Sequence, residues 1–404
     1  MERTKRKLMI SFIIVLIVIA SYLMLVFSNI TFISKWRTIY IETAMTTMTH
    51  QWLATAFIPR KVINKVLENR TVQDDEIAEL VEKWGNVRVF KPEEVVNVAD
   101  NNSTEKIDTE QDKLLSLFHE INTESFTEYI AHNNVNLDSG YEKLVIDESK
   151  AKSSGPSIKT IQGDNILVLD AVNGILIVEV EGEGFRGRLA LIKDAGKVKL
   201  ASAGQLGNTG DRLRQIMKSN KAILGINASG FKDTNWKGNG GTVVGMYIKD
   251  GKMIEKPYEH KAWVMIGFDY DNNLRIGSYK DTSIFRDAVQ FTPPLVLNGE
   301  RVVKGTAGYG LQPRTSIGQT RKGEVMLLTI DGRQPGWSVG ATMEQCIDVM
   351  LRYEALQAAA LDGGSSTIMI YNNEVINRPA GSEEGRRIPN AFIVMPTSIS
   401  IDGE

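Results

Sequence analysis

Three apolar runs in the second half of the chain each end in an Asn or Asp residue. The runs are "AILGIN", "EVMLLTID" and "LQAAALD", and their last residues are Asn227, Asp331 and Asp362. Polar side chains from distant parts of a chain converge where buried strands end, and crevices form at the same edge. A carboxylate there can act as a general base or stabilise a positively charged transition state. The alternative is that all three are plain β-turns, because Asp-Gly and Asn-x-x-Gly favour turns.

A glycine-serine segment follows the last of these runs. After Asp362 come Gly363, Gly364, Ser365 and Ser366, and a second apolar run then begins. Glycines let backbone N–H groups approach a ligand closely, and successive N–H groups in such a turn form a nest that binds anions. We therefore expect this turn to form the floor of a site, with the Asp362 carboxylate pointing into a crevice where Asn227, Arg314 and Asp331 converge.

An arginine in "YGLQPRTSIGQT" is a candidate for anion binding. Arg314 follows Pro313, which fixes the direction of the chain, and it precedes the strand-like residues Thr315 and Ser316. The planar guanidinium group suits a phosphate or a carboxylate. The alternative is a surface salt bridge. Further candidates for substrate binding are Thr315, Ser316, Arg333 in "DGRQPG", and Asn390 in "GRRIPNAFIV".

Composition and charge exclude several classes of function. The formal net charge of -2 over 404 residues argues against a general nucleic-acid-binding protein, which needs an excess of Lys and Arg. The single cysteine, Cys346, provides neither a disulfide nor a Cys-based zinc site, and we expect it to pack in a helix. We expect neither a cofactor nor a catalytic metal, because His260 is the only histidine beyond residue 150. A structural divalent cation stays an open alternative.

The N-terminus has the pattern of a membrane anchor. Residues 9–27 carry no charge and are long enough to cross a bilayer as a helix, and four basic residues precede them. The positive-inside rule then keeps the N-terminus in the cytoplasm and places the C-terminal domain outside. A cleaved signal peptide is the alternative, but no small-x-small cleavage site follows the apolar run. We expect a single-pass protein of the cell membrane.

The rest of the chain divides into a helical spacer and a strand-rich domain. Within the spacer, residues 29–150, we expect a helix over 29–70 that Pro59 interrupts, a short amphipathic helix and a strand-like piece in 74–90, a polar linker at 97–113 and a helix at 114–130. From residue 155 onward, strand-like runs separated by turns follow one another. They are 165–172, 175–182, 187–194, 222–228, 242–254, 262–270 and 273–279.

Two helices are expected in the strand-rich domain. One occupies "TGDRLRQIMKSNK", with Thr209 or Asp211 near its N-cap, and the other follows Thr342, where Gln345 completes a capping-box pattern. Strands in hairpins with few helices indicate an α+β or mixed α/β fold, here a mixed β-sheet flanked by helices.

Five segments together resemble the phosphodiester glycosidase family over residues 155–398. They are "INASGF", "QPRTSIGQT", "LLTIDGRQPGWSVGATMEQC", "ALDGGSSTIM" and "RRIPNAFIV", in this order. The resemblance implies a hydrolase that cleaves the sugar C1–O bond of a glycosyl-1-phosphodiester, of the GlcNAc-1-phosphodiester type. It also implies that Asp362 or Asp331 is the base or the stabilising carboxylate. Arg314 and the turn 363–366 would bind the phosphate, and Asn227 and Asn390 would bind sugar hydroxyl or acetamido groups.

Two other classes stay open. A non-catalytic glycan-binding protein, or one that assembles exopolysaccharide or another envelope polymer, would keep the same fold. A metal-dependent phosphodiesterase would cut the P–O bond instead, although His260 offers little for a two-metal site. For an exported protein we expect the substrate to be a cell-envelope polymer linked through phosphodiesters.

Overall fold

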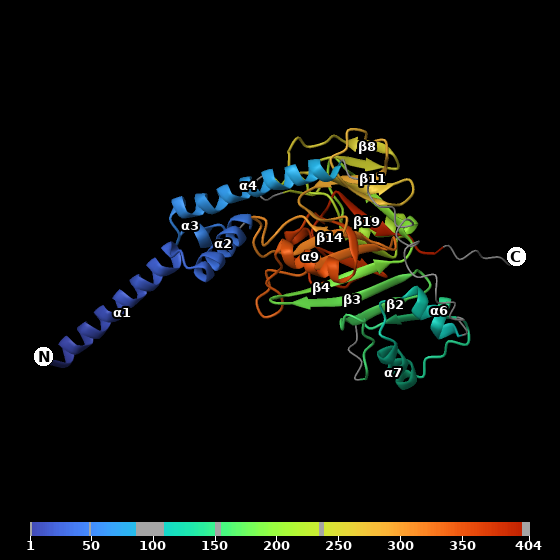
Figure 1. The fold of residues 1–404 in the computed structure, drawn as a ribbon, viewed down its shortest axis with the longest axis horizontal. Coiled ribbons are helices and arrows are strands. Elements are labelled where there is room, and N and C mark those ends of the chain that lie inside the picture. Colours follow the sequence, from blue (N-terminus) through green and yellow to red (C-terminus); the bar gives the residue numbers. More distant parts are fainter. Residues whose placement is uncertain (1, 48–49, 86–108, 150–154, 234–237, 398–404) are drawn as a thin grey trace. The chain divides into compact units, whose positions relative to one another are not determined.

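The structure is a computed structural model that describes residues 2–47, 50–85, 109–149, 155–233 and 238–397 (Figure 1). The chain divides into two compact units. The first comprises Met1–Gln73 with Thr306–Leu311, and the second comprises Asp74–Gly305 with Gln312–Glu404. Eight α-helices and three antiparallel sheets lie in the described residues, so the expected α+β class is confirmed.

The first unit is helical. Its helices are α1 (Glu2–Phe27), α2 (Thr31–Thr46), α3 (Trp52–Thr55) and the first half of α4 (Arg60–Gly85). Residues Arg3–Phe27 of α1 are long and apolar enough to cross a membrane, a property that an N-terminal signal sequence shares. The other helices bury a small core built from α2, α3 and the start of α4. Its members are Ile41, Ala44, Ala54, Ile58, Ile63 and Val66, together with Val26 at the end of α1.

The helices of residues 29–85 differ from the prediction. The chain leaves the helical conformation at Thr47, whose backbone is extended, so α2 ends at Thr46, thirteen residues before Pro59. In contrast, α4 continues from Arg60 to Gly85 as one helix, and the amphipathic segment at residue 74 is its second half. Neither Pro nor Gly occurs in 60–84 to interrupt it. The predicted strand-like piece and most of the predicted linker lie outside the described residues.

The helix predicted at residues 114–130 is two helices. They are α6 (Glu110–Leu117), which begins four residues inside the predicted linker, and α7 (Thr123–Asn133). Each has its own N-cap, because the Thr109 side chain accepts from Asp112 N and the Asn122 side chain accepts from Ser125 N. Strand β1 (Val145–Asp147) then pairs with β2, so the sheet begins before residue 155. The functional boundary at residue 155 stays a prediction.

The largest sheet has nine strands in the order β1-β2-β3-β4-β15-β14-β16-β12-β13. The strands after β1 are β2 (Asn165–Asp170), β3 (Ile175–Gly182), β4 (Phe185–Ile192), β12 (Pro294–Leu297), β13 (Glu300–Arg301), β14 (Arg314–Thr320), β15 (Val325–Ile330) and β16 (Ala355–Leu361). Strands β14, β15 and β16 are buried along their whole length. Burial on both faces explains why β15 and β16 are continuous apolar runs in the sequence.

Two five-stranded sheets complete the second unit, in the orders β10-β9-β11-β7-β8 and β18-β17-β6-β19-β5. Their strands are β5 (Val198–Ser202), β6 (Leu224–Asn227), β7 (Tyr247–Lys249), β8 (Lys252–Glu255), β9 (Val264–Asp269), β10 (Leu274–Gly277), β11 (Phe285–Phe291), β17 (Met369–Tyr371), β18 (Glu374–Val375) and β19 (Asn390–Val394). Every one of the seven predicted strand-like runs overlaps at least one strand, which confirms the predicted pattern.

The two predicted helices are present, with one correction. Helix α9 (Met343–Arg352) has the expected capping box of Thr342 and Gln345. Helix α8 (Leu213–Asn220) begins after Arg212, and neither predicted cap is used. The carboxylate of Asp211 accepts instead from Gly204 N at 2.7 Å, so Asp211 caps a turn before the helix and not the helix itself.

The pleat of β14 determines which of its side chains point toward the candidate site. Helix α9 packs on β12, β14 and β16, and a Cβ on Gly318 of β14 would lie 3.5 Å from Met350 Sδ of α9. On the opposite face, the Thr315 hydroxyl reaches Asn227 of β6, and Gln319 Oε1 accepts from Leu274 N of β10. Successive β14 side chains therefore alternate between the α9 face and the face of the smaller sheets.

Candidate active site

The ends of β6 and β16 meet at Asp362. The Asp362 N–H donates to Ala228 O at 3.1 Å, and Asn227 Nδ2 donates to Asp362 O at 2.5 Å. These bonds join two sheets at the point where one strand from each sheet ends. The structure therefore brings Asn227 and Asp362 together, as their positions after apolar runs predicted.

The side chain of Asn227 is entirely buried and serves as a positioning group. Its Oδ1 accepts from the Thr315 hydroxyl at 2.9 Å and from Ile368 N at 3.2 Å. Thr315 is 1% exposed and contacts the Thr367 hydroxyl at 3.2 Å. The Asn227 side chain has no exposed surface, and its hydrogen bonds hold the strand ends together.

The turn after Asp362 requires its two glycines. Gly364 has a φ of +60°, and a Cβ on Gly363 would lie 2.7 Å from Pro313 O. The Gly364 N–H donates to Pro313 O at 2.9 Å, and Ser366 N donates to Gly363 O at 3.2 Å. Two N–H groups of the predicted anion nest are therefore used within the protein. Ser365 is partly exposed, whereas Ser366 is buried.

Asp362 is a partly buried residue, and burial of its carboxyl group raises the pKa from 3.8 to about 6. A hydrogen bond from Ser366 and the positive charges of Arg386 and Arg333 act in the other direction, whereas the negative charge of Asp233 adds to the rise. A carboxylate with this pKa can accept a proton from water near neutral pH.

Two arginines provide the positive charge beside Asp362. The backbone of Arg333 is left-handed, with φ of +60°, and its Nε and Nη2 donate to Gln312 Oε1 at 2.9 and 2.6 Å. Its Nη2 lies 3.1 Å from where a Cβ on Gly364 would stand. Within the described part of the chain, Arg333 has no carboxylate within salt-bridge distance.

Arg386 is held from two sides. Its Nη2 donates to Asp233 Oδ2 at 2.8 Å, and its guanidinium group lies 4.5 Å from the centre of the Phe231 ring. In the sequence, Arg386 stands out in "GRRIPNAFIV" but no role could be assigned to it, and Asp233 was not predicted as a site residue. Asp233 lies just beyond "INASGF", and a turn aspartate in the same place would look identical in the sequence.

Asp331, the second predicted carboxylate, has a different environment. It is 1% exposed, and it accepts from Trp337 Nε1 at 2.9 Å, Asn377 Nδ2 at 3.1 Å and Arg378 N at 2.8 Å. Burial raises its pKa, and these three hydrogen bonds oppose the rise. Asp331 thus ties the loop after β15 to the segment after β18. Its contacts favour a positioning role.

Arg314 and Ser316 lie on the other face of β14. Arg314 is 6% exposed, and its Nε donates to Ala341 O, next to α9, at 2.9 Å. Ser316 is buried, and its hydroxyl has no hydrogen-bond partner among the described residues. We expected both residues to bind substrate beside Asn227 and Asp362. The structure corrects this placement, because the pleat turns them toward α9 and only Thr315 toward Asn227.

Comparison with known proteins identifies the family of this region. Residues 220–395 match the profile of the phosphodiester glycosidase family. This segment belongs to that family. It contains β6, β14 to β16, β19 and all the residues described above, so the phosphodiester glycosidase segment coincides with the candidate site.

Three proteins are similar to this chain in sequence or in structure. The SPbeta prophage-derived uncharacterized protein YomE of Bacillus subtilis (strain 168) is 29% identical over 196 residues, which are 45% of this chain and 29% of the relative. The chain therefore spans less than a third of that relative's length. Among solved structures, the zebrafish N-acetylglucosamine-1-phosphodiester alpha-N-acetylglucosaminidase catalytic domain, auto-inhibited by its pro-peptide, has 18% identity and a TM-score of 0.47, with coverage of 66% of this chain and 92% of that chain. A hypothetical protein from Synechocystis has 14% identity and a TM-score of 0.41, with coverage of 55% and 62%.

Asn390, at the C-terminal end of the phosphodiester glycosidase segment, supports the loop after β6. Its Oδ1 accepts from Ser229 N at 2.9 Å, and its Nδ2 donates to the Ser229 hydroxyl at 3.0 Å. The Asn390 side chain is fully buried. It therefore positions the chain beside Asn227, and its predicted role in sugar binding stays a prediction.

The described residues contain one group of possible metal ligands, and an ammonium group lies within it. His119, Glu120 and Glu324 form this group, but Lys193 Nζ is 2.7 Å from both Glu120 Oε1 and Glu324 Oε1. The arrangement fits a buried ion pair and not a divalent cation. His260 lies elsewhere, stacked on Tyr258 with a centroid distance of 6.1 Å.

Proposed function

We propose that this chain hydrolyses the bond between C1 of a sugar and the phosphate oxygen of a glycosyl-1-phosphodiester. The phosphodiester glycosidase family supports a glycosidase-type enzyme. The more specific proposal rests on one observation: the carboxyl group of Asp362, whose pKa burial raises to about 6, lies within the influence of two arginine charges where β6 and β16 meet.

In the proposed step, Asp362 acts as a general base. The carboxylate takes a proton from water, the water oxygen bonds to C1, and the bond from C1 to the phosphate oxygen breaks with its electron pair leaving on the phosphate. The products are a free sugar and a phosphomonoester. The departing phosphomonoester is a stable anion, so it needs little protonation, in contrast to the leaving group of an ordinary glycosidase.

We assign the departing phosphate to Arg333 and Arg386. Both charges act on the Asp362 carboxyl group, and Arg333 is the one with no carboxylate partner among the described residues. Positive charge aimed at the developing phosphate charge stabilises the transition state more than the ground state. Asp233 holds Arg386 in place, and Gln312 holds Arg333.

We further propose that α1 anchors the enzyme in the cell membrane, with the second unit on the extracytoplasmic side. The four basic residues before the apolar run support this orientation. A cell-envelope polymer linked through phosphodiesters, with GlcNAc-1-phosphate or a related sugar at the cleaved position, is then the substrate that the enzyme would meet.

Hydrolysis in heavy-oxygen water tests the proposed bond cleavage. The full-length protein in detergent is incubated with GlcNAc-1-phosphodiester substrates, and both products are analysed by mass spectrometry. Attack at C1 places the heavy oxygen in the free sugar. Label in the phosphate would show P–O cleavage and would contradict the proposal, and binding without any turnover would favour a non-catalytic glycan-binding protein.

A further inference from the structure

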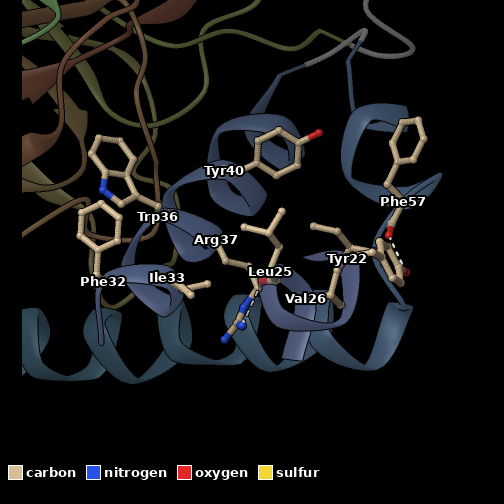
Figure 2. A pocket seen from close by; sticks show the side chains of 10 residues that line it. Tyr22, Leu25, Val26, Phe32, Ile33, Trp36, Arg37, Tyr40 and Phe57 are labelled. Atoms are coloured by element: carbon tan, nitrogen blue, oxygen red, sulfur yellow. Dashed lines mark hydrogen bonds between the residues drawn. The ribbon is translucent and has the colours of Figure 1, made fainter. Parts of the chain in front are cut away.

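A pocket of about 670 Å³ lies in the first unit, at the end of α1 (Figure 2). It is lined by Tyr22 and Val26 from the last turns of α1, by residues of α2, and by Phe57. The close-up shows Phe32, Trp36 and Tyr40 along α2 on one side, and the Tyr22 hydroxyl bonded to Phe57 O on the other. Arg37 is the only charged residue in its lining.

The surface around this pocket is unusually apolar for a surface in water. Phe32 is 71% exposed, Trp36 47% and Phe57 58%. Residues 28–73 contain six exposed large hydrophobic side chains, whereas the whole second unit contains seven in its described part. Soluble surfaces rarely gather such side chains in one place, and a gathered patch marks a contact with lipid or another molecule.

The position of the pocket along α1 indicates that lipid, and not another protein, covers this apolar surface. The uncharged residues 9–27 rise about 28 Å as a helix, at about 1.5 Å a residue. The apolar core of a bilayer is about 30 Å thick, so the end of α1 lies at the outer edge of this core, next to the lipid headgroups. Trp and Tyr side chains gather at this level in membrane proteins, as Tyr22, Trp36 and Tyr40 do here.

We propose that the pocket binds a hydrocarbon chain of a bilayer phospholipid, and that α2 and Phe57 lie in the outer interface of the membrane. The pocket continues the apolar surface of α1, so a chain can enter it from the bilayer without crossing water. This inference rests on the proposed membrane anchor, and it assigns a lipid site that the anchor alone does not require.

Arg37 provides a partner for the phosphate of the same lipid. Its Nη1 donates to Ser28 O at 2.9 Å, which fixes the guanidinium group at the end of α1. Its Nε is buried and has no hydrogen-bond partner among the described residues, and no described carboxylate pairs with it. The positive charge of Arg37, which no described carboxylate neutralises, favours an anionic lipid phosphate near the end of α1.

Fluorescence quenching by lipids tests the depth of α2. The full-length protein is placed in nanodiscs whose phospholipids carry bromine on their acyl chains, and tryptophan emission is compared with that in unbrominated nanodiscs. The quenched part of the emission should fall in Trp36→Phe and stay unchanged in the matched control Trp263→Phe, whose site lies in the second unit. Equal quenching in wild type and Trp36→Phe would overturn the proposal.

Filling the pocket tests the bound lipid directly. Ile33 lines the pocket, and Ile14 lies 55% exposed in the middle of α1. Native mass spectrometry of the detergent-purified protein should show that Ile33→Trp retains phospholipid at an occupancy at least about tenfold lower, because it removes several buried methylene contacts. Ile14→Trp should retain lipid like the wild type, and an undiminished occupancy in Ile33→Trp would contradict the inference.

The same samples separate this proposal from the proposed enzyme and anchor. Hydrolysis of a soluble glycosyl-1-phosphodiester should be equal in wild type, Ile33→Trp and Ile14→Trp, since none of the changes touches the second unit. Loss of lipid with intact activity supports the lipid site. Recovery of the full-length protein outside the membrane fraction would overturn the anchor and with it the lipid site, and would leave the catalytic proposal standing.

Discussion

Asp331 and Asp362 follow similar apolar runs, and both are followed by glycine, yet their surroundings differ. Three donors surround the buried Asp331 carboxylate. Asp362 is partly exposed and lies near charges of both signs. The partners of each carboxylate come from segments far away in the chain. The local sequence therefore predicted two equivalent candidates, and the contacts separate them.

The rate should depend on the protonation of Asp362. A general base works only when it is deprotonated, and burial raises the pKa of Asp362 to about 6. We expect kcat/KM to fall as the pH is lowered through about 6 and to level off above it. The measurement is a pH–rate profile with a soluble substrate. A rate that does not change on crossing this pH would exclude Asp362 as the base.

The same raised pKa predicts that Asp362→Asn makes the protein more stable, although it should make the enzyme less active. Because the folded pKa lies above the usual 3.8, the folded state favours the proton, and the stabilisation present at low pH is lost as the pH rises through about 6. Removing the charge should therefore raise the free energy of unfolding at pH 7, by at most about 3 kcal/mol. Denaturant titrations should show no such gain well below pH 4.

A fall in stability of the Asn variant at pH 7 would instead favour the plain-turn interpretation. The matched control is Asp348→Asn on the surface of α9. The Asp348 side chain is 54% exposed and pairs with Arg301. It should leave the free energy of unfolding almost unchanged, because exposed ion pairs contribute little.

The sequence predicted the location of the site but only part of its membership. Asn227 and Asp362 end apolar runs that are typical of strands, and the turn after Asp362 requires glycine. The local sequence pattern was therefore enough to predict the strand ends and the turn. Arg314 shows the limit. The face of the sheet on which the Arg314 side chain lies depends on the register of β14 with β15 and β16. It also depends on which layer covers each face. The local sequence pattern predicts neither.

At the level of elements, a buried ion pair joins the helical segment before β1 to the large sheet. Lys193 follows β4, Glu324 precedes β15, and Glu120 lies between α6 and α7. All three side chains are less than 10% exposed, and Lys193 Nζ lies 2.7 Å from each carboxylate. Residues 109–147 thus pack with the sheet as part of the second unit.

Replacing the lysine should unfold this connection. Lys193→Met leaves the two buried carboxylates with His119 as their remaining ionisable neighbour, at 3.6 and 3.7 Å, and burial lowers the pKa of that histidine. We therefore expect a loss of about 3–5 kcal/mol in the free energy of unfolding. Burial already raises the pKa of Glu120, so protonation at lower pH should recover part of this loss. Thermal melts of wild type and variant at pH 5 and pH 8 measure it.

The control for this prediction is Lys113→Met. Lys113 pairs with Glu110 within α6 and is 47% exposed, so its removal should leave the melting temperature unchanged. Equal melting temperatures for wild type and Lys193→Met at pH 8 would show that the buried pair contributes nothing to the fold.

The sequence predicted strands better than helices at this scale. Each apolar run between turn residues contributed to a strand, because a short run that is buried between two layers and bounded by turns is easily recognised as a strand. The helices before residue 150 were misjudged in length, since caps at Thr109 and Asn122 divide one periodic stretch and no residue interrupts another.

For the whole molecule, the anchor predicts the accessibility of the second unit. The basic residues ahead of the apolar run should keep the N-terminus inside, so the remaining chain should lie outside the cell membrane. Protease added to intact cells or spheroplasts should digest the second unit, and a cytoplasmic marker should survive. A second unit that is protected until the cells are lysed would contradict this topology.

The central claim is that the Asp362 carboxylate drives the cleavage of a glycosyl-1-phosphodiester. The direct measurement is kcat/KM of wild type, Asp362→Asn and the control Asp348→Asn with the same GlcNAc-1-phosphodiester, on samples shown to be folded by circular dichroism. We predict that Asp362→Asn reduces the rate by at least about 100-fold, as expected for loss of a general base, and that Asp348→Asn retains the wild-type rate. A folded Asp362→Asn protein that hydrolyses the substrate at the wild-type rate would contradict the claim.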